Sequence, residues 1–130
     1  MKIPTLRIAG VLTAAAAALL LASCATPGAS GAVAGAWGTA DTRGEPSLTF
    51  APAAEGDGGE VSGNDGCNVI GGSYTLTNGT IEFGVLHSTM MFCEGVDTWL
   101  QHAHTGTVQG DTLTVRDESG AEIGTLERAK

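Results

Sequence analysis

Residues 73–83 read Ser73-Tyr74-Thr75-Leu76-Thr77-Asn78-Gly79-Thr80-Ile81-Glu82-Phe83, two runs of strand-forming residues separated by Asn-Gly. Asn-Gly is the strongest two-residue signal for a β-hairpin, because both positions tolerate positive φ. A two-residue loop here gives the pairs Thr77 with Thr80, Leu76 with Ile81, Thr75 with Glu82 and Tyr74 with Phe83. All the apolar residues then fall on one face, so the loop chemistry and the alternation independently predict the same antiparallel hairpin.

A second hairpin is predicted farther along the chain. A loop at Gly110-Asp111 pairs Val108 with Leu113 and Gly106 with Val115, and the alternation again holds. The turn at 117–120 then leads into a strand over 121–127. Ile123 and Leu126 have opposite parity in this strand, which predicts a bulge near Gly124.

Earlier strands are predicted over 36–39, 47–51 and 60–62, with the Gly- and Asp-rich residues 55–59 as the turn between the last two. One segment reads as a helix. Between Gly95 and His104, apolar residues recur at spacings of three, one and three, which gives a single stripe made of Val96, Trp99, Leu100 and Ala103.

The N-terminus has the three-part shape of an export signal. Lys2 and Arg7 precede an uncharged stretch over residues 8–22 that is rich in Ala and Leu. Fifteen apolar residues are too few for a transmembrane helix, which needs roughly 20. We therefore expect residues 1–23 to be a signal peptide that is removed.

The end of this signal, Leu21-Ala22-Ser23-Cys24, resembles the lipobox of bacterial lipoproteins. The resemblance implies that Cys24 becomes the first residue and carries a diacylglycerol thioether. The chain is then expected to be exported and anchored through Cys24 to the outer face of the bacterial cell membrane. The alternative is an ordinary secretory signal that contains a cysteine.

Removal of residues 1–23 leaves a strongly acidic chain. Four basic residues then remain against fourteen acidic residues, a net charge of −10. Such a chain repels phosphate backbones, which argues against nucleic acid as a partner. It would also not adhere to anionic lipid headgroups, so the acyl chains on Cys24 are the expected link to the membrane.

The composition divides the mature chain into two parts. Residues 25–36 read ATPGASGAVAGA, with no charge and one Val, so residues 24–36 are predicted to be the lipidated cysteine and a flexible tether. Residues 37–130 have the length of one small domain. A domain of this size buries only roughly two thirds of its unfolded surface, so a cross-link would add useful stability.

Several short motifs stand in a recognisable order along residues 37–130. They are Gly66-Cys67-Asn68, Gly72-Ser73-Tyr74, Thr89-Met90-Met91-Phe92-Cys93 and Gly110-Asp111-Thr112-Leu113-Thr114-Val115, followed by Asp117 and Gly120. In this order they resemble the META domain, the family of the heat-shock lipoprotein HslJ. The resemblance marks as family-motif positions Gly66, Cys67, Asn68, Gly72, Tyr74, Thr89, Met90 and Cys93.

The resemblance implies a mainly β fold. We expect a small antiparallel sheet, rolled or barrel-like, with one short α-helix packed across it. The resemblance implies no established enzymatic activity. Members of the family have been linked to heat stress, antibiotic tolerance and virulence without a molecular mechanism.

The cysteine count predicts a disulfide. With Cys24 consumed by the lipid, Cys67 and Cys93 remain in a domain that meets an oxidising compartment. They flank the predicted hairpin at 73–83, whose turn brings its two ends together. We therefore predict a bond between Cys67 and Cys93. The alternative is two buried thiols that act as small hydrophobic residues.

Two groups of residues raise the possibility of a metal site. Residues 63–68 are predicted to form a turn. The alternative is a cation-binding loop that would use Asp57, Glu60 and Asp65, but these residues lack the regular ligand spacing of calcium loops. The three histidines, His87, His102 and His104, could bind zinc. His102 and His104, however, lie at the end of the predicted helix, where a spacing of two residues points the rings to different sides. We expect no metal and no cofactor.

A catalytic cysteine is the sharpest enzyme hypothesis, with Cys67 or Cys93 as thiolate and His87 or His102 as base. Two cysteines in an exported domain more often form a disulfide, and no nucleophile elbow or phosphate loop appears. We expect no catalytic residue. The expected function is a non-enzymatic envelope lipoprotein whose domain binds or shields another envelope component, as a stress-related module. The alternative is a small-ligand carrier that uses the mouth of the sheet.

Overall fold

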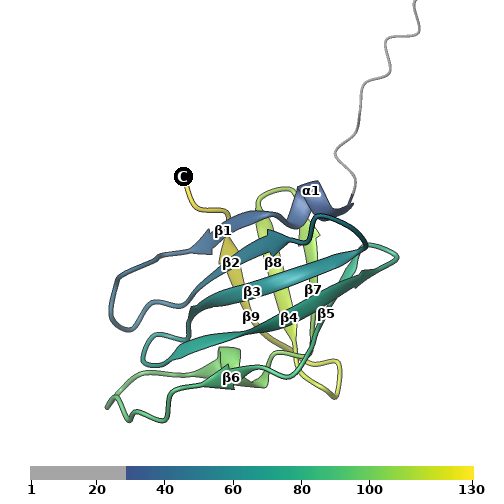
Figure 1. The fold of residues 1–130 in the computed structure, drawn as a ribbon. Helices are drawn as coiled ribbons and strands as arrows, with labels where there is room; N and C mark the ends of the chain where they lie inside the picture. Colours follow the sequence, from purple (N-terminus) through teal and green to yellow (C-terminus); the bar gives the residue numbers. More distant parts are fainter. Residues whose placement is uncertain (1–28) are drawn as a thin grey trace, which may run out of the picture.

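The computed structural model describes residues 29–130, which form one nine-stranded antiparallel sheet (Figure 1). The elements in chain order are α1 (Ala29–Val33), β1 (Gly35–Gly38), β2 (Ser47–Pro52), β3 (Gly58–Asn64), β4 (Val69–Thr77), β5 (Thr80–Phe83), β6 (His87–Ser88), the 3₁₀ helix η1 (Trp99–His102), β7 (Thr105–Gln109), β8 (Thr112–Arg116) and β9 (Glu122–Glu127). The strand order is β1-β2-β3-β4-β5-β7-β8-β9, and β6 pairs with β4 outside this path. No helix in the described part of the chain is long and apolar enough to cross a membrane.

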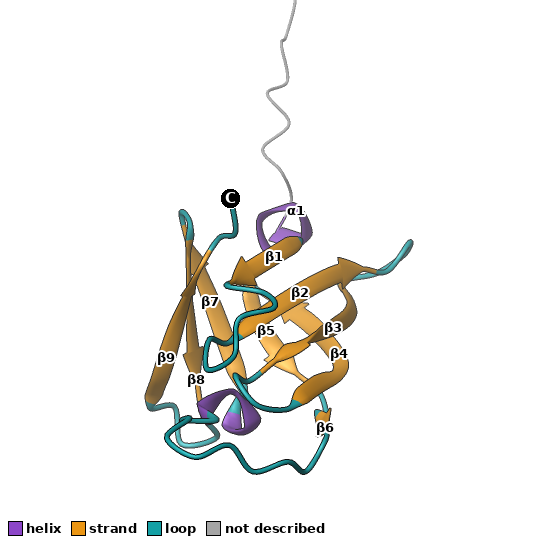
Figure 2. Ribbon diagram, turned by 90° about the vertical axis from the view of Figure 1, so that its left-hand side faces the viewer, coloured by secondary structure: helices purple, strands orange, loops and turns teal. Residues whose placement is uncertain are grey.

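The sheet is rolled into a nearly closed barrel (Figure 2). Trp37 of β1 forms an isolated bridge with Arg128, the residue that follows β9, and the Ala129 N–H donates to the Ala36 carbonyl at 3.0 Å. The expected mainly β, barrel-like fold is therefore confirmed.

Both predicted hairpins have the expected register. β4 and β5 pair Tyr74 with Phe83 and Leu76 with Ile81, around Asn78 and Gly79, which have φ of 52° and 81°. Positive φ at both positions is what the Asn-Gly sequence predicts. β7 and β8 pair as predicted too, with Val108 opposite Leu113 and Gly106 opposite Val115.

The bulge expected in β9 lies beside Gly124. Val115 pairs with Gly124 and Arg116 with Glu122, so Ile123 is the extra residue. Because the bulge shifts the parity, Ile123 and Leu126 both pack against the core. The preceding turn is held by Asp117, whose carboxylate accepts hydrogen bonds from Ser119 and Ala121, and these bonds lower the pKa of Asp117.

Alternate residues of the strands fill the interior of the rolled sheet. Thirteen apolar residues are buried, with Trp37, Ile81, Leu100, Leu113 and Val115 fully inaccessible. Aromatic rings form the centre, where Tyr74 meets Phe50 edge to face at 5.0 Å between ring centroids.

The predicted α-helix over 95–104 is wrong. Only Trp99–His102 form one turn of 3₁₀ helix. Gly95 has a φ of 74°, which starts the segment outside a helix, and Thr98 makes no side-chain cap. The chain then extends at Ala103, because the His104 carbonyl accepts a hydrogen bond from the Phe83 N–H at the start of sheet pairing. The apolar stripe still packs on the core through Trp99, Leu100 and Ala103.

The folded part also begins earlier than the predicted boundary at Trp37. Ala29–Val33 form α1, and the Val33 side chain is buried. Residues 29–36 are therefore not a flexible tether in this structure. The signal peptide at 1–23, Cys24 and the rest of the tether up to residue 28 lie outside the described residues.

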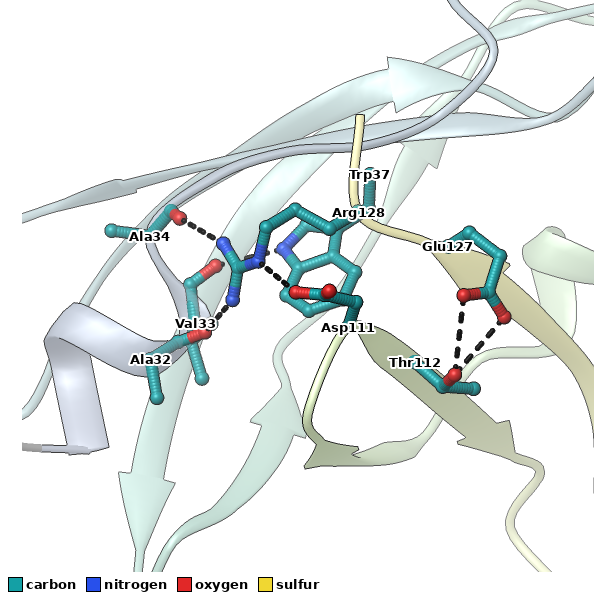
Figure 3. Close-up of polar contacts among 8 residues, drawn as sticks. All are labelled: Ala32, Val33, Ala34, Trp37, Asp111, Thr112, Glu127 and Arg128. Atoms are coloured by element: carbon teal, nitrogen blue, oxygen red, sulfur yellow. Dashed lines mark hydrogen bonds and ion pairs between the residues drawn. The ribbon is translucent and has the colours of Figure 1, made fainter. Parts of the chain in front are cut away.

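One arginine ties this N-terminal segment to the closing strand (Figure 3). The Arg128 guanidinium donates to the carbonyls of Ala32 at 2.6 Å and Ala34 at 3.3 Å, and its Nε lies 3.3 Å from Asp111 Oδ1. It also stacks 4.2 Å from the centroid of the Trp37 ring. A cation at the C-terminal end of α1 complements the carbonyls that the helix leaves without partners.

Candidate functional site

The candidate site joins two loops that are far apart in the sequence. One is the turn over 64–68 between β3 and β4, and the other is the loop over 89–93 that follows β6. The Cys67–Cys93 disulfide connects them, with 5.8 Å between Cα atoms across a separation of 26 residues. The predicted disulfide is therefore present.

The first loop is a turn built around Asp65, as the sequence indicated. Asp65 Oδ1 accepts hydrogen bonds from the N–H groups of Cys67 at 2.9 Å and Asn68 at 2.6 Å. Asp65 Oδ2 accepts a bond from the Gln101 side-chain amide of η1 at 2.7 Å. Gly66 has a φ of 100°, a conformation that favours glycine. The buried carboxylate thus holds both the turn and η1.

Asn68 holds the second loop through its side chain. Its Oδ1 accepts bonds from the Met91 N–H at 2.6 Å and the Thr89 hydroxyl at 3.0 Å. Its Nδ2 donates to the Met91 carbonyl at 3.2 Å. The side chain therefore mimics a neighbouring strand for Met91, and Asn68 is only 2% exposed.

The three residues between these anchors point into solvent. We call Met90, Met91 and Phe92 the apolar tip; their exposed fractions are 92%, 64% and 90%. Val69, at the start of β4, is also 62% exposed. The tip borders a hollow of about 280 Å³ whose lining includes Asn68 and Gln101. Three consecutive exposed large apolar side chains on a braced loop are typical of an interaction site.

No cationic side chain comes from the segments that form this site. Residues 84–104 and 63–70 contain no Lys or Arg, whereas Glu94 and Asp97 are exposed acidic residues just after the tip. The segments that carry the tip therefore combine apolar side chains with negative charge. The loop that carries the exposed Arg43 packs against the turn of the site, where the Gly44 N–H donates to the Gly66 carbonyl at 2.9 Å.

The site lies at the opposite end of the rolled sheet from the N-terminal connection. In both views α1 is at the upper end, and β6 with the loops around it is at the lower end (Figures 1 and 2). A chain held by its N-terminus would thus present the apolar tip away from the point of attachment.

The structure separates the predicted family-motif residues into two groups. The turn and the tip bring together Gly66, Cys67, Asn68, Thr89, Met90 and Cys93. The other two lie farther along β4. A Cβ on Gly72 would lie 2.6 Å from the Val85 carbonyl oxygen, so this glycine lets the loop over 84–86 pack closely, while Tyr74 is in the core.

The Tyr74 hydroxyl is buried without a hydrogen-bond partner in the part of the chain that the structure describes. It is the one buried side-chain oxygen or nitrogen of the described residues for which this holds. Burial raises the pKa of Tyr74, because the charged phenolate would be poorly solvated in the core.

The residues of the metal and thiolate hypotheses do not form one site. His87 lies on β6, His102 in η1 and His104 just before β7. Within residues 29–130 no three His, Cys, Asp or Glu side chains gather so that they could hold a metal ion. Cys67 and Cys93 are bonded to each other, so neither is a free thiol.

Sequence reasoning missed the exposed position of Met91 and Phe92 and the role of Gln101. The run of three large apolar residues at 90–92 was a signal of this exposure. Consecutive large apolar residues cannot all face one side of a strand, so at least one of three in a row points away from a core. The short spacing between Thr89 and Cys93 then leaves these residues on a loop.

Fold and site together define a small, disulfide-linked antiparallel β-domain with an exposed apolar tip. The META domain profile matches residues 31–130, so the chain belongs to the META domain family. An NMR structure of a protein from Burkholderia xenovorans is similar in fold, with a TM-score of 0.53 and 22% sequence identity over 78% of this chain and 87% of that chain. No curated protein matches this sequence.

Proposed function

We propose that this chain is an exported lipoprotein of the bacterial cell envelope, anchored through Cys24. The export signal, the lipobox-like Leu21-Ala22-Ser23-Cys24 and the acidic mature chain support this placement. Labelling with a fatty-acid analogue tests it. The label should be incorporated into the wild-type chain and lost in Cys24→Ala. A secreted Cys24→Ala chain that retains the label would contradict the anchor.

The META domain of this lipoprotein is a non-enzymatic binding module, and the apolar tip is its binding surface. The observation that carries this proposal is the 92%, 64% and 90% exposure of the three tip side chains on a loop braced by a disulfide and by Asn68. A braced loop loses little conformational entropy when it docks, which favours affinity. The filled interior of the sheet supports this function over a small-ligand carrier.

The partner that this surface fits is an envelope protein with an apolar pocket and a basic rim. Met and Phe are enriched in the buried centre of interfaces, where they fill such pockets. Glu94 and Asp97 beside the tip would meet Lys or Arg at the rim of the pocket. The net charge of −10 on the mature chain disfavours anionic lipid and nucleic acid as occupants.

Photo-cross-linking in intact cells tests the binding surface. A photoreactive phenylalanine analogue replaces Phe92 in one chain and the exposed Thr49 of β2 in a matched control. We expect a discrete protein adduct from position 92 that disappears with Met90→Ser and Met91→Ser, and none from position 49. The same adducts from both positions, or an adduct that survives the serine substitutions, would contradict docking by the tip.

A further inference from the structure

The methionines of this chain are concentrated in the apolar tip. The sequence has three methionines, and apart from the initiator Met1 they are Met90 and Met91. Their side chains are 92% and 64% exposed. Most methionines in proteins are buried in the core, so this placement needs a reason other than packing.

The backbone of the tip is held without the methionine side chains. Asn68 bonds the N–H and the carbonyl of Met91, and the disulfide fixes the residue that ends the loop, Cys93. A chemical change at either thioether therefore leaves these hydrogen bonds and the core in place. The change would act on the surface that the tip presents.

We propose that Met90 and Met91 are a site of reversible oxidation, at which two-electron oxidants of the cell envelope convert the tip from apolar to polar. The oxidants are hypohalous acids and hydroperoxides. With hypochlorous acid, the sulfur atom gives up two electrons and gains the oxygen atom as a sulfoxide, and chloride and a proton leave. With a hydroperoxide the same oxygen transfer leaves an alcohol or water. In the reverse step two thiols supply two electrons and two protons, form a disulfide, and release the oxygen as water.

The consequence for binding rests on the proposed function of the tip. A sulfoxide is a strong hydrogen-bond acceptor, and placing it in an apolar pocket without a donor costs free energy. Oxidation of Met90 and Met91 thus releases the docked partner while the domain stays folded. The tip acts as a docking surface that responds to oxidants outside the cytoplasm.

Treatment of the purified chain with hypochlorite, followed by peptide mass spectrometry, tests the oxidation site. We expect a gain of about 16 Da on each of Met90 and Met91, at rates within about twofold of those in the urea-unfolded chain. The melting temperature should move by less than about 2 °C. The matched control Met90→Leu/Met91→Leu keeps the apolar surface but should gain no oxygen in the tip. Rates slowed more than about tenfold by folding, or loss of the folded state on oxidation, would overturn the proposal.

A second arm tests the release. Cells carrying the photoreactive residue at position 92 are exposed to hypochlorite before illumination. The adduct should be lost with Met90 and Met91 present and kept with Met90→Leu/Met91→Leu. An adduct that persists on fully oxidised chains would overturn the switch. Absence of any adduct before oxidation would instead count against the proposed docking function, and the mass measurements would still decide the oxidation site.

Discussion

At the scale of single residues, Tyr74 shows a side chain whose ring and hydroxyl have opposite effects. The ring packs against Phe50 in the centre of the core, but the buried hydroxyl has no partner within the described residues. A buried hydroxyl without a hydrogen bond costs roughly 1–3 kcal/mol. We predict that Tyr74→Phe is neutral or raises the free energy of unfolding, by up to about 1.5 kcal/mol. Chemical denaturation measures it, and a loss above about 1 kcal/mol would show that the hydroxyl has a partner, such as a buried water.

The same residue makes the stability of the domain depend on pH at the alkaline end. Tyr74 is the one tyrosine of the chain, and burial raises its pKa above its ordinary value of about 10. The unfolded chain therefore loses this proton at a lower pH than the folded chain does. The stabilisation is fully present below about pH 10 and is lost as the pH rises through the folded pKa. The ultraviolet absorbance of tyrosinate should titrate above pH 10 in the folded protein, and Tyr74→Phe should remove this part of the alkaline destabilisation. Titration at the ordinary pKa would contradict a buried phenol.

Asn68 has the opposite character, because all of its polar atoms are used. Its removal leaves the N–H and carbonyl of Met91 without their partner. We predict that Asn68→Ala lowers the free energy of unfolding by about 2–4 kcal/mol. Asn64→Ala is the control, since Asn64 makes a single bond to the Gly66 N–H, and its loss should cost about 0.5–1 kcal/mol. Equal costs would mean that Asn68 does not brace the tip.

At the scale of elements, the sequence predicted the hairpin registers, because turn residues and alternation close by in the chain determine them. The registers of β4–β5 and β7–β8 follow from turn residues and alternation within a dozen positions. The helix predicted over 95–104 fails for a local and a non-local reason. Gly95 has a positive φ, and the His104 carbonyl accepts a hydrogen bond from the Phe83 N–H of another strand, so the chain is extended there. The apolar tip was missed for a related reason. Its exposure depends on Asn68, which lies 23 residues away from Met91 in the sequence.

Gly124 shows how one element constrains another. A Cβ at this position would lie 2.6 Å from the Trp99 ring, so the bulge in β9 leaves room for η1 to pack. We predict that Gly124→Ala lowers the free energy of unfolding by about 1–3 kcal/mol. In a Trp99→Leu background the same change should cost at least about 0.5 kcal/mol less, because the clash is removed. Additive effects of the two substitutions in thermal denaturation would argue against this contact.

The disulfide gives the tip its second anchor and closes a loop of 26 residues. We predict that Cys67→Ser/Cys93→Ser lowers the free energy of unfolding by roughly 3–4 kcal/mol in the chain-entropy model. Reduction of the wild-type chain should lower its melting temperature by about as much as the double substitution does. Intact-mass measurement after alkylation under denaturing conditions checks the bond itself. Uptake of two alkyl groups by the unreduced domain would show free thiols.

At the scale of the whole molecule, stability depends on joining the two ends of the sheet. The edge strands come from opposite ends of the described chain, and one isolated bridge joins Trp37 of β1 to Arg128, the residue after β9. The burial of Val33 and the hydrogen bond from the Trp37 indole to the Val33 carbonyl at 2.9 Å extend this closure to α1. The segment that leads toward the proposed anchor is thus part of the closure, and the tip occupies the other end (Figure 1).

Arg128 is the residue on which this closure should depend most. Its ion pair with Asp111 is weak, because the Asp111 side chain is 81% exposed, so Asp111→Ala should cost less than about 0.5 kcal/mol. Arg128→Ala also removes the bonds to the Ala32 and Ala34 carbonyls and the stacking on Trp37, and we predict a loss of about 2–3 kcal/mol. Arg128→Lys should fall between the two, because an ammonium cannot reach both carbonyls and lie flat on the indole. Urea denaturation at low and high salt gives a further check, since the exposed ion pair is screened more strongly than the contacts of Arg128 with the carbonyls and the indole. If Asp111→Ala costs as much as Arg128→Ala, the ion pair rather than the cap and the stacking closes the sheet.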